Sequence, residues 1–264
     1  MKVYISADIE GCTFITDWKE TEQGEEEYAQ GRKIMTNEVV AACEGAIAAG
    51  ATEIVIKDAH DSALNLIPYA FPEEATLIRG WTCTPESMVA GIDETFNAAV
   101  FIGYHSGAGF DGNPLAHTMN TQNNYVKING RPAAEFDLNA YTAAYYDVPV
   151  VFVSGDEELC EHAKELVPEI TAVGVKKGVG EATFSMNLNK ACRLIKEGVA
   201  SALKNTDACK IKSPDKFEME ISFKDPVKAL RGSFYPGAKQ LDPRTVTYTG
   251  KDIQDMMTAR MFML

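Results

Sequence analysis

Acidic and histidine side chains follow three of the strands that this sequence predicts. Asp8 and Glu10 come directly after the first strand, and residues two apart in an extended chain point the same way. His60 and His105 each stand just past a further predicted strand. Two carboxylates and two imidazoles are typical ligands for zinc, with Mn²⁺, Co²⁺ or Fe²⁺ as substitutes. The residue types therefore predict a metal site.

The convergence of these residues depends on the sheet that must carry them. A strand at 2–7, a helix with its apolar residues between 35 and 49, and a strand at 53–57 form a βαβ pattern, which indicates a parallel sheet. Further apolar runs at 97–104 and 148–154 continue it. The carboxyl ends of parallel strands line one edge of an α/β sheet, where ligands bind. Alone, a strand-end Asp is more typical of a turn and a buried His of a hydrogen-bonded core, so the hypothesis depends on their coincidence.

The composition changes near residue 206. The preceding part alternates strands and helices, which favours an α/β domain over 1–206. Alternation at 217–223, a possible partner strand at 245–248 and a Met-rich helix at the end favour a smaller α+β unit over 207–264.

Several other residues have an open interpretation. His117 is compatible with a further ligand, a general acid/base or a structural histidine. Glu135 is simply an acid in the first turn of a predicted helix, where the helix dipole favours it. His162 lies on the polar face of a predicted helix, and we expect it to be solvated. Asp58 and Asp61 flank His60 and either orient its imidazole or lie at the surface.

The net charge of the chain argues against two classes of binding partner. Lys and Arg number 25 and Asp and Glu 38, so the net charge is 25 − 38 = −13. This argues against nucleic acid and against an anionic membrane surface as partners. No apolar run reaches the ~18 residues of a membrane span, and the N-terminus lacks the pattern of a signal peptide. The six cysteines form no C-x-x-C pair, which is typical of reduced thiols, and we expect a cytoplasmic protein.

Short motifs give a more specific indication. They agree in order and spacing with one family up to about residue 205, whereas the last sixty residues resemble it only loosely. The motifs are Ser6–Gly11, Gly31–Thr36, Lys57–Ser62, Gly103–His105, Ala116–Met119, Arg131–Glu135, Leu138–Tyr141, Tyr145–Val150 and Val153–Asp156. On these residues the sequence resembles the zinc-dependent D-aminopeptidase family, the DppA-like peptidases associated with dipeptide transport.

The resemblance implies a site with two zinc ions. Asp8 would bridge the ions, and His117 matches the catalytic histidine of the family. The five implied ligands are Asp8, Glu10 and His60 for one ion, and Asp8, His105 and Glu135 for the other. It also implies a Rossmann-like core with a mainly parallel sheet and helices on both faces, and a homo-oligomer described for the family as a decamer.

The resulting hypothesis is a metal-dependent aminopeptidase that acts on short peptides, with D-amino-acid peptides implied by the resemblance. Two alternatives stay open. One is another two-metal hydrolase, an amidase or a phosphoesterase; a phosphoesterase usually presents additional basic residues, and the motifs nearest the ligands contain only Lys57 and Arg131. The other is a non-catalytic peptide-binding protein with the same fold.

Overall fold

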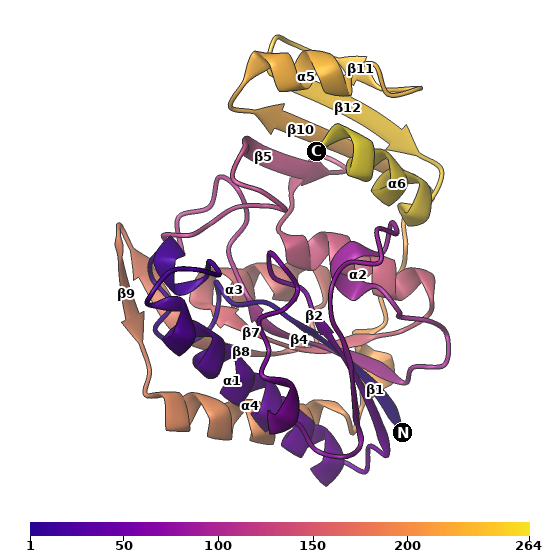
Figure 1. Ribbon diagram of the computed structural model, residues 1–264. Helices are drawn as coiled ribbons and strands as arrows, with labels where there is room; N and C mark the ends of the chain where they lie inside the picture. Colours follow the sequence, from indigo (N-terminus) through magenta and orange to yellow (C-terminus); the bar gives the residue numbers. More distant parts are fainter.

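The computed structural model describes residues 1–264 and contains two β-sheets (Figure 1). The larger sheet has seven strands in the order β3-β2-β1-β4-β7-β8-β9 and is parallel except for β9. Its strands are β1 (Lys2–Ala7), β2 (Glu53–Asp58), β3 (Ala75–Ile78), β4 (Ala98–Tyr104), β7 (Val150–Asp156), β8 (Thr171–Val179) and β9 (Ala182–Ser185). The α/β class predicted from the sequence is confirmed.

The strand order reverses between β1 and β4. The chain proceeds from β1 to β2 and β3 on one side, then returns to β4 beside β1 and continues outward to β7 and β8. Ala7, the last residue of β1, pairs with Asp58 of β2 and with Ile102 of β4. A crevice outside the carboxyl ends at such a reversal is the usual ligand position in open α/β sheets.

Helices cover both faces of this sheet (Figure 1). The helices α1 and α4 pack side by side on one face, and α2 and α3 cover the other. Their bounds are α1 (Tyr28–Ala48), α2 (Glu135–Tyr145), α3 (Glu157–Leu166) and α4 (Leu188–Ala202). Because both faces are covered, β4 and β7 are buried along their whole length, which explains why they read as continuous apolar runs.

The smaller sheet has five antiparallel strands in the order β11-β12-β10-β5-β6. They are β5 (Asn123–Ile128), β6 (Arg131–Pro132), β10 (Phe217–Phe223), β11 (Lys239–Gln240) and β12 (Thr245–Gly250), and the helices α5 (Pro226–Gly232) and α6 (Ile253–Met263) accompany them. Two of these strands, β5 and β6, precede the boundary predicted at 206. The smaller unit is therefore completed by the hairpin 123–132, and that boundary does not separate the two sheets.

Each sheet has its own apolar core. The core of the larger sheet contains 49 buried hydrophobic residues, and that of the smaller sheet contains 15. In the smaller core Phe217, Met219 and Ile221 of β10 face inward at alternate positions, as the sequence pattern predicts, and meet Met256 and Met257 of α6.

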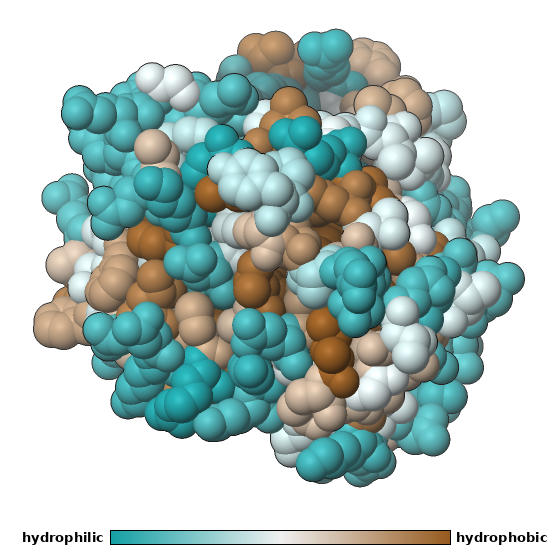
Figure 2. All heavy atoms as spheres, turned by 60° about the horizontal axis from the view of Figure 1, so that its bottom comes forward, coloured by the Kyte–Doolittle hydropathy of each residue, from teal (hydrophilic) through white to brown (hydrophobic).

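The remaining elements are short 3-10 turns in the connections: Trp18–Glu20, Pro68–Ala70, Ser87–Val89 and Thr206–Cys209. None of the helices is both long enough and apolar enough to cross a membrane. On the face shown in Figure 2, hydrophobic residues are interspersed among hydrophilic ones.

Candidate metal centre

The predicted ligands converge at the crevice between β1 and β4. Asp8 and Glu10 follow β1, His60 follows β2, and His105 follows β4. Glu135 is the first residue of α2, which brings it to the same crevice. All five side chains are buried, with relative exposures between 1% and 7%. The structure therefore brings together the whole ligand set that was expected.

The two oxygens of Asp8 face two different imidazoles. Its Oδ1 lies 3.3 Å from Nδ1 of His60, and its Oδ2 lies 3.5 Å from Nε2 of His105. Each imidazole atom also faces a second carboxylate: Glu10 Oε2 lies 3.0 Å from His60 Nδ1, and Glu135 Oε2 lies 3.5 Å from His105 Nε2. The carboxylate of Asp8 thus stands between two groups of ligands.

The backbone fixes which imidazole nitrogen faces the carboxylates. His60 Nε2 lies 2.9 Å from the Thr21 carbonyl oxygen, and His105 Nδ1 lies 2.9 Å from that of Ser106. A carbonyl only accepts, so these nitrogens donate, and the opposite nitrogen of a neutral ring presents its lone pair to the carboxylates. Lone pairs that face one another require a proton or a cation between them.

Two buried atoms are consistent with a positive charge at this centre. Glu10 Oε2 and His105 Nε2 are inaccessible to solvent and have no hydrogen-bond partner. Buried polar atoms without partners are costly unless a ligand satisfies them. Carboxylate oxygens and imidazole nitrogens are the donors that zinc takes in proteins, so the residues fit the metal.

The electrostatics of the ligand cluster agree with this interpretation. Burial lowers the pKa of His105, but the Glu135 and Glu10 carboxylates outweigh burial and raise it to about 10. Burial and the neighbouring Glu10 charge raise the pKa of Asp8 well above its usual value. Burial also raises the pKa of Glu135, but the charges of His105 and His117 outweigh it and lower the pKa to about 2. The carboxylates of the centre therefore favour positive charge beside the imidazoles, which is the charge a metal ion supplies.

His117 differs from the other two histidines. Burial and the charge of His105 lower its pKa, so it is neutral at neutral pH. Its ring stacks on that of His105 at 4.3 Å, and its Nδ1 lies 2.8 Å from the Leu115 carbonyl oxygen. Its Nε2 lies 3.5 Å from Glu135 Oε1. The ligand atoms of His105, His117 and Glu135 lie within 4.8 Å of one another, so distance alone also admits His117 as a ligand.

Comparison with known proteins decides the family. The family model described as D-aminopeptidase, peptidase M55, matches residues 1–262. The chain belongs to this D-aminopeptidase family. It is 36% identical over 266 residues to the D-aminopeptidase of Bacillus subtilis (strain 168), and the match covers 100% of this chain and 96% of that one.

A solved structure shares the fold. The structure described as the Zn-dependent D-aminopeptidase DppA from Bacillus subtilis, a self-compartmentalizing protease, superposes with a TM-score of 0.94 at 35% identity, and the match covers 100% of this chain and 96% of that one. The predicted family, the fold class and the classification as a peptidase are confirmed. The family match extends well beyond residue 205, so the last sixty residues belong to it as well.

Two glycines let the D-aminopeptidase fold bring its ligand loops together. A Cβ at Gly11 would lie 1.8 Å from the Tyr104 carbonyl oxygen, and one at Gly103 would lie 2.2 Å from that of Asp8. Gly103 also has a φ of +70°, which L side chains rarely adopt. The Gly11 amide donates to the Gly103 carbonyl oxygen at 2.8 Å. The loops after β1 and β4 can therefore touch, which places Asp8 near His105.

Buried polar side chains hold these loops from behind. The Asp156 carboxylate accepts from the Ser106 amide at 2.7 Å and from Asn113 Nδ2 at 3.1 Å. Asn113 Nδ2 also donates to the Glu10 carbonyl oxygen at 2.9 Å. Lys176, which is 2% exposed, donates to the same carbonyl oxygen from β8. The backbone that presents Glu10 is therefore fixed from two sides.

Some expectations about neighbouring residues were wrong or are now resolved. His162 is buried rather than solvated, because the polar face of α3 meets α2 and His162 Nε2 lies 2.7 Å from Asp137 Oδ2. Asp58 does not contact the His60 imidazole. It is buried and accepts hydrogen bonds from Asn65, whose side-chain amide also donates to the His60 carbonyl oxygen at 2.7 Å. Asp61 is exposed.

Neither basic residue of the nearby motifs contacts the ligand set. Lys57 Nζ donates to backbone carbonyl oxygens of Asp58 and Gly80. Arg131 interacts with Asp137 and with Glu165, the latter at 3.3 Å.

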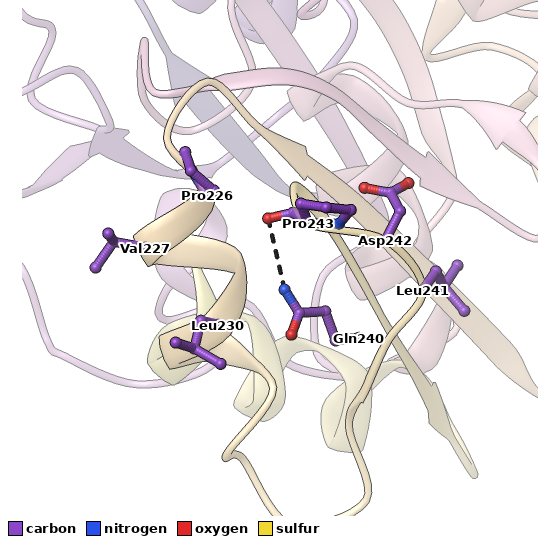
Figure 3. Close-up of a pocket in the computed structure, with 7 residues that line it drawn as sticks. All are labelled: Pro226, Val227, Leu230, Gln240, Leu241, Asp242 and Pro243. Carbon is purple, nitrogen blue, oxygen red and sulfur yellow. Dashed lines mark hydrogen bonds between the residues drawn. The ribbon is translucent and has the colours of Figure 1, made fainter.

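The centre opens into a cavity of about 380 Å³, and its lining includes a residue that the sequence analysis missed. This residue is Arg260 of α6. A single arginine among Met, Ala and Phe in the C-terminal helix was the signal that could have pointed to it. A second cavity, of about 540 Å³, lies between α5 and the segment after β11 (Figure 3) and contains no residue of the metal centre.

Proposed function

We propose that this chain is a zinc-dependent aminopeptidase that removes the N-terminal residue from short peptides with D-amino acids. The position of the Asp8 carboxylate carries this proposal. Its two oxygens face two different imidazoles, and each imidazole also faces a second carboxylate. The zinc dependence rests on the description of the solved relative, which is 35% identical, and the D-preference rests on both relatives and on the family.

Two zinc ions would occupy the centre. Glu10 and His60 would hold one, His105 and Glu135 the other, and Asp8 would bridge them. Bound in this way, paired zinc ions supply a Lewis acid for the scissile carbonyl and activate water at neutral pH. The surrounding protein buries the five ligands, and Asn113 and Lys176 hold the backbone of Glu10.

His117 would transfer protons. It is neutral at neutral pH and donates through Nδ1 to the Leu115 carbonyl oxygen, so the lone pair on Nε2 is free to take a proton. The ring lines the same cavity as Asp8 and His60, where the scissile bond must lie. In this position His117 delivers a proton to the leaving amine, a contribution worth about 10²- to 10⁴-fold in rate.

The chain would also assemble with copies of itself. The DppA relative is described as self-compartmentalizing. Large apolar side chains are exposed on the C-terminal unit of this chain, among them Val227, Leu230, Phe234 and Phe262 at 50–79%. We propose that they are covered by neighbouring subunits in a ring-built oligomer such as the decamer implied by the resemblance. Light scattering coupled to size exclusion tests this, and a monomeric mass would contradict it.

One preparation tests the catalytic proposal. Zinc is measured per subunit in protein purified without added metal, and amino-acid release is followed on D-Ala-D-Ala and L-Ala-L-Ala with the same sample. We expect about two zinc ions, as a paired site requires, and chelator-sensitive release that favours the D-peptide. Metal-loaded protein that cleaves neither peptide would contradict the aminopeptidase assignment.

A further inference from the structure

An arginine from the C-terminal unit lines the cavity of the metal centre. Arg260 lies on α6, whereas the five ligands come from the larger sheet and α2. It is the only lysine or arginine among the residues that line this cavity. The two units of the molecule thus meet at the site, and the smaller one contributes a cation.

The guanidinium of Arg260 has no partner within the protein. It forms no salt bridge and no side-chain hydrogen bond, and its Nε is inaccessible to solvent without an acceptor. By contrast, Arg32 donates to the Asn65 carbonyl oxygen, Arg193 pairs with Glu197, and Arg244 donates to the Lys224 carbonyl oxygen. Arg260 is only partly exposed, and a largely buried charge without a partner is costly, so no contact within the protein explains its position.

Arg260 is nonetheless charged and held in place. Burial lowers its pKa, to about 10, and the nearby Glu135 carboxylate opposes this, so the guanidinium stays protonated at neutral pH. The helix that carries it is tied to the larger unit. Gln254 Nε2 donates to Glu86 Oε1 and to the Tyr146 hydroxyl, each at 2.8 Å. Asn120 Nδ2 donates to the carbonyl oxygen of Leu264 at 3.2 Å.

The chemistry of a short peptide supplies the missing partner. Such a substrate carries an ammonium group, a scissile carbonyl and a C-terminal carboxylate. Of the acidic residues around the cavity, Asp8 and Glu135 would be neutralised by zinc, and Asp61 repels the C-terminal carboxylate. Arg260 is the cationic side chain that can pair with this carboxylate. A guanidinium pairs with a carboxylate through two parallel hydrogen bonds, which gives both affinity and orientation. A cavity of about 380 Å³ is at the small end of ligand sites, a size that suits a short peptide better than a long one.

We propose that Arg260 binds the free C-terminal carboxylate of the peptide and thereby makes the enzyme selective for short peptides with an unblocked C-terminus. This inference rests on the aminopeptidase function proposed above. Arg260 is then a specificity-determining residue that the smaller unit supplies to a site built by the larger one.

The test compares an acid with its amide. Initial rates are measured on D-Ala-D-Ala and on D-Ala-D-alaninamide for the full-length zinc-loaded enzyme, for Arg260→Met and Arg260→Lys, and for Arg231→Met. Arg231 is exposed on α5 and serves as the matched control. Zinc content and the unfolding midpoint are measured on every sample, since a residue without partners should be removable without loss of either.

We expect Arg260→Met to lower kcat/KM on the free acid by about 10- to 100-fold, mainly through KM, as the loss of a charged hydrogen-bonded pair does. Its kcat/KM on the amide should stay within about twofold of wild type. Arg260→Lys should retain part of the preference for the acid, because it keeps the charge but loses the two-pronged geometry.

The outcomes separate this inference from the proposed function. Equal losses on acid and amide, or no loss on the acid, would overturn the role of Arg260 while aminopeptidase activity of the wild type stands. Loss of zinc or a lower unfolding midpoint in Arg260→Met would also overturn it, because the residue would then be structural. Wild-type enzyme that cleaves neither substrate would overturn the proposed function, and the Arg260 assignment with it.

Discussion

The carboxyl edge of the larger sheet and the C-terminal unit contrast in how they use polar residues. At the sheet edge, carboxylates and imidazoles are buried together, and two of their atoms have no partner. The C-terminal unit is held by an apolar core rich in methionine, with exposed apolar side chains outside. The first region gathers several buried polar groups that a ligand would satisfy. The second region adds stability, surface and one residue of the cavity lining, Arg260, whose Nε also has no acceptor.

The largest effect is expected from removal of Asp8, the ligand that the two zinc ions would share. Asp8→Ala should lose both zinc ions, since each group of ligands includes one Asp8 oxygen. Activity should fall by about 10³-fold or more, as expected when the Lewis acid is lost. Metal analysis and turnover are measured together, with Asp111→Ala, an exposed carboxylate, as control. An Asp8→Ala protein that still holds two ions would refute the bridging role.

Removal of His117 separates catalysis from metal binding. His117→Ala should keep both zinc ions and lose about 10²- to 10⁴-fold in kcat, because the proton acceptor is gone while the five ligands remain. Zinc content and steady-state kinetics check this on one preparation. If the variant loses one equivalent of zinc, His117 is a ligand rather than a proton carrier.

A substitution in the C-terminal core should lower the stability of the fold without changing the zinc content. Ile221 is fully buried in β10, so Ile221→Ala should lower the free energy of unfolding by about 2–5 kcal/mol and leave zinc content unchanged. Urea unfolding and metal analysis measure the two quantities. Glu218→Ala, on the exposed side of the same strand, provides the comparison. Zinc loss in Ile221→Ala at temperatures where the fold is intact would mean that the two regions are not separable in this way.

A smaller effect is expected from the support behind Glu10. Lys176→Met removes the buried donor to the Glu10 carbonyl oxygen, and zinc affinity should fall by about 10- to 100-fold, as for other residues that orient ligands. Competition with a chelator of known affinity measures this. The adjacent Lys177 is exposed, so Lys177→Met should bind zinc like wild type. Equal zinc affinities in both variants would show that the loop of Glu10 does not need the hydrogen bond from Lys176.

The smallest effect concerns the junction of the two regions. Burial raises the pKa of Glu86, but hydrogen bonds from Thr84, Tyr146 and Gln254 outweigh burial and lower the pKa below its usual 4.5. A carboxyl with a lowered pKa in the folded state stabilises above its unfolded pKa, and this stabilisation is lost as the pH falls through the folded value. When the pH is lowered from 7 to below about 4.5, the free energy of unfolding should therefore fall further in the wild type than in Glu86→Gln. Urea titrations at the two pH values measure this difference. Identical acid sensitivity would remove Glu86 from the junction.

The sequence predicted the parts of the site that depend on local order. Asp8, Glu10, His60 and His105 follow strands, and a parallel sheet places such positions at one edge whatever the details of packing. Glu135 was reached only through the family resemblance, because an acid in the first turn of a helix is common for reasons of helix electrostatics. In the larger sheet, β1, β2, β4 and β7 were predicted because burial leaves apolar runs in such strands, whereas the short edge strands β3 and β9 were not predicted.

The rest depends on contacts between distant segments. The hairpin of β5 and β6 joins the C-terminal strands through pairing of β5 with β10, about ninety residues later, which no local pattern reports. His162 was misread because its helix presents its polar face to Asp137 rather than to water. Arg260 reaches the centre only because α6 docks on the larger unit through Gln254. Such docking is a property of the assembled fold.

The most direct test of this account is the position of zinc in crystals of the metal-loaded protein, located by its anomalous scattering. We predict two peaks on either side of the Asp8 carboxylate, one against Glu10 and His60 and the other against His105 and Glu135, with His117 unligated. A single peak, or a peak bound by His117 in place of His105, would contradict the division of ligands on which the proposed mechanism depends.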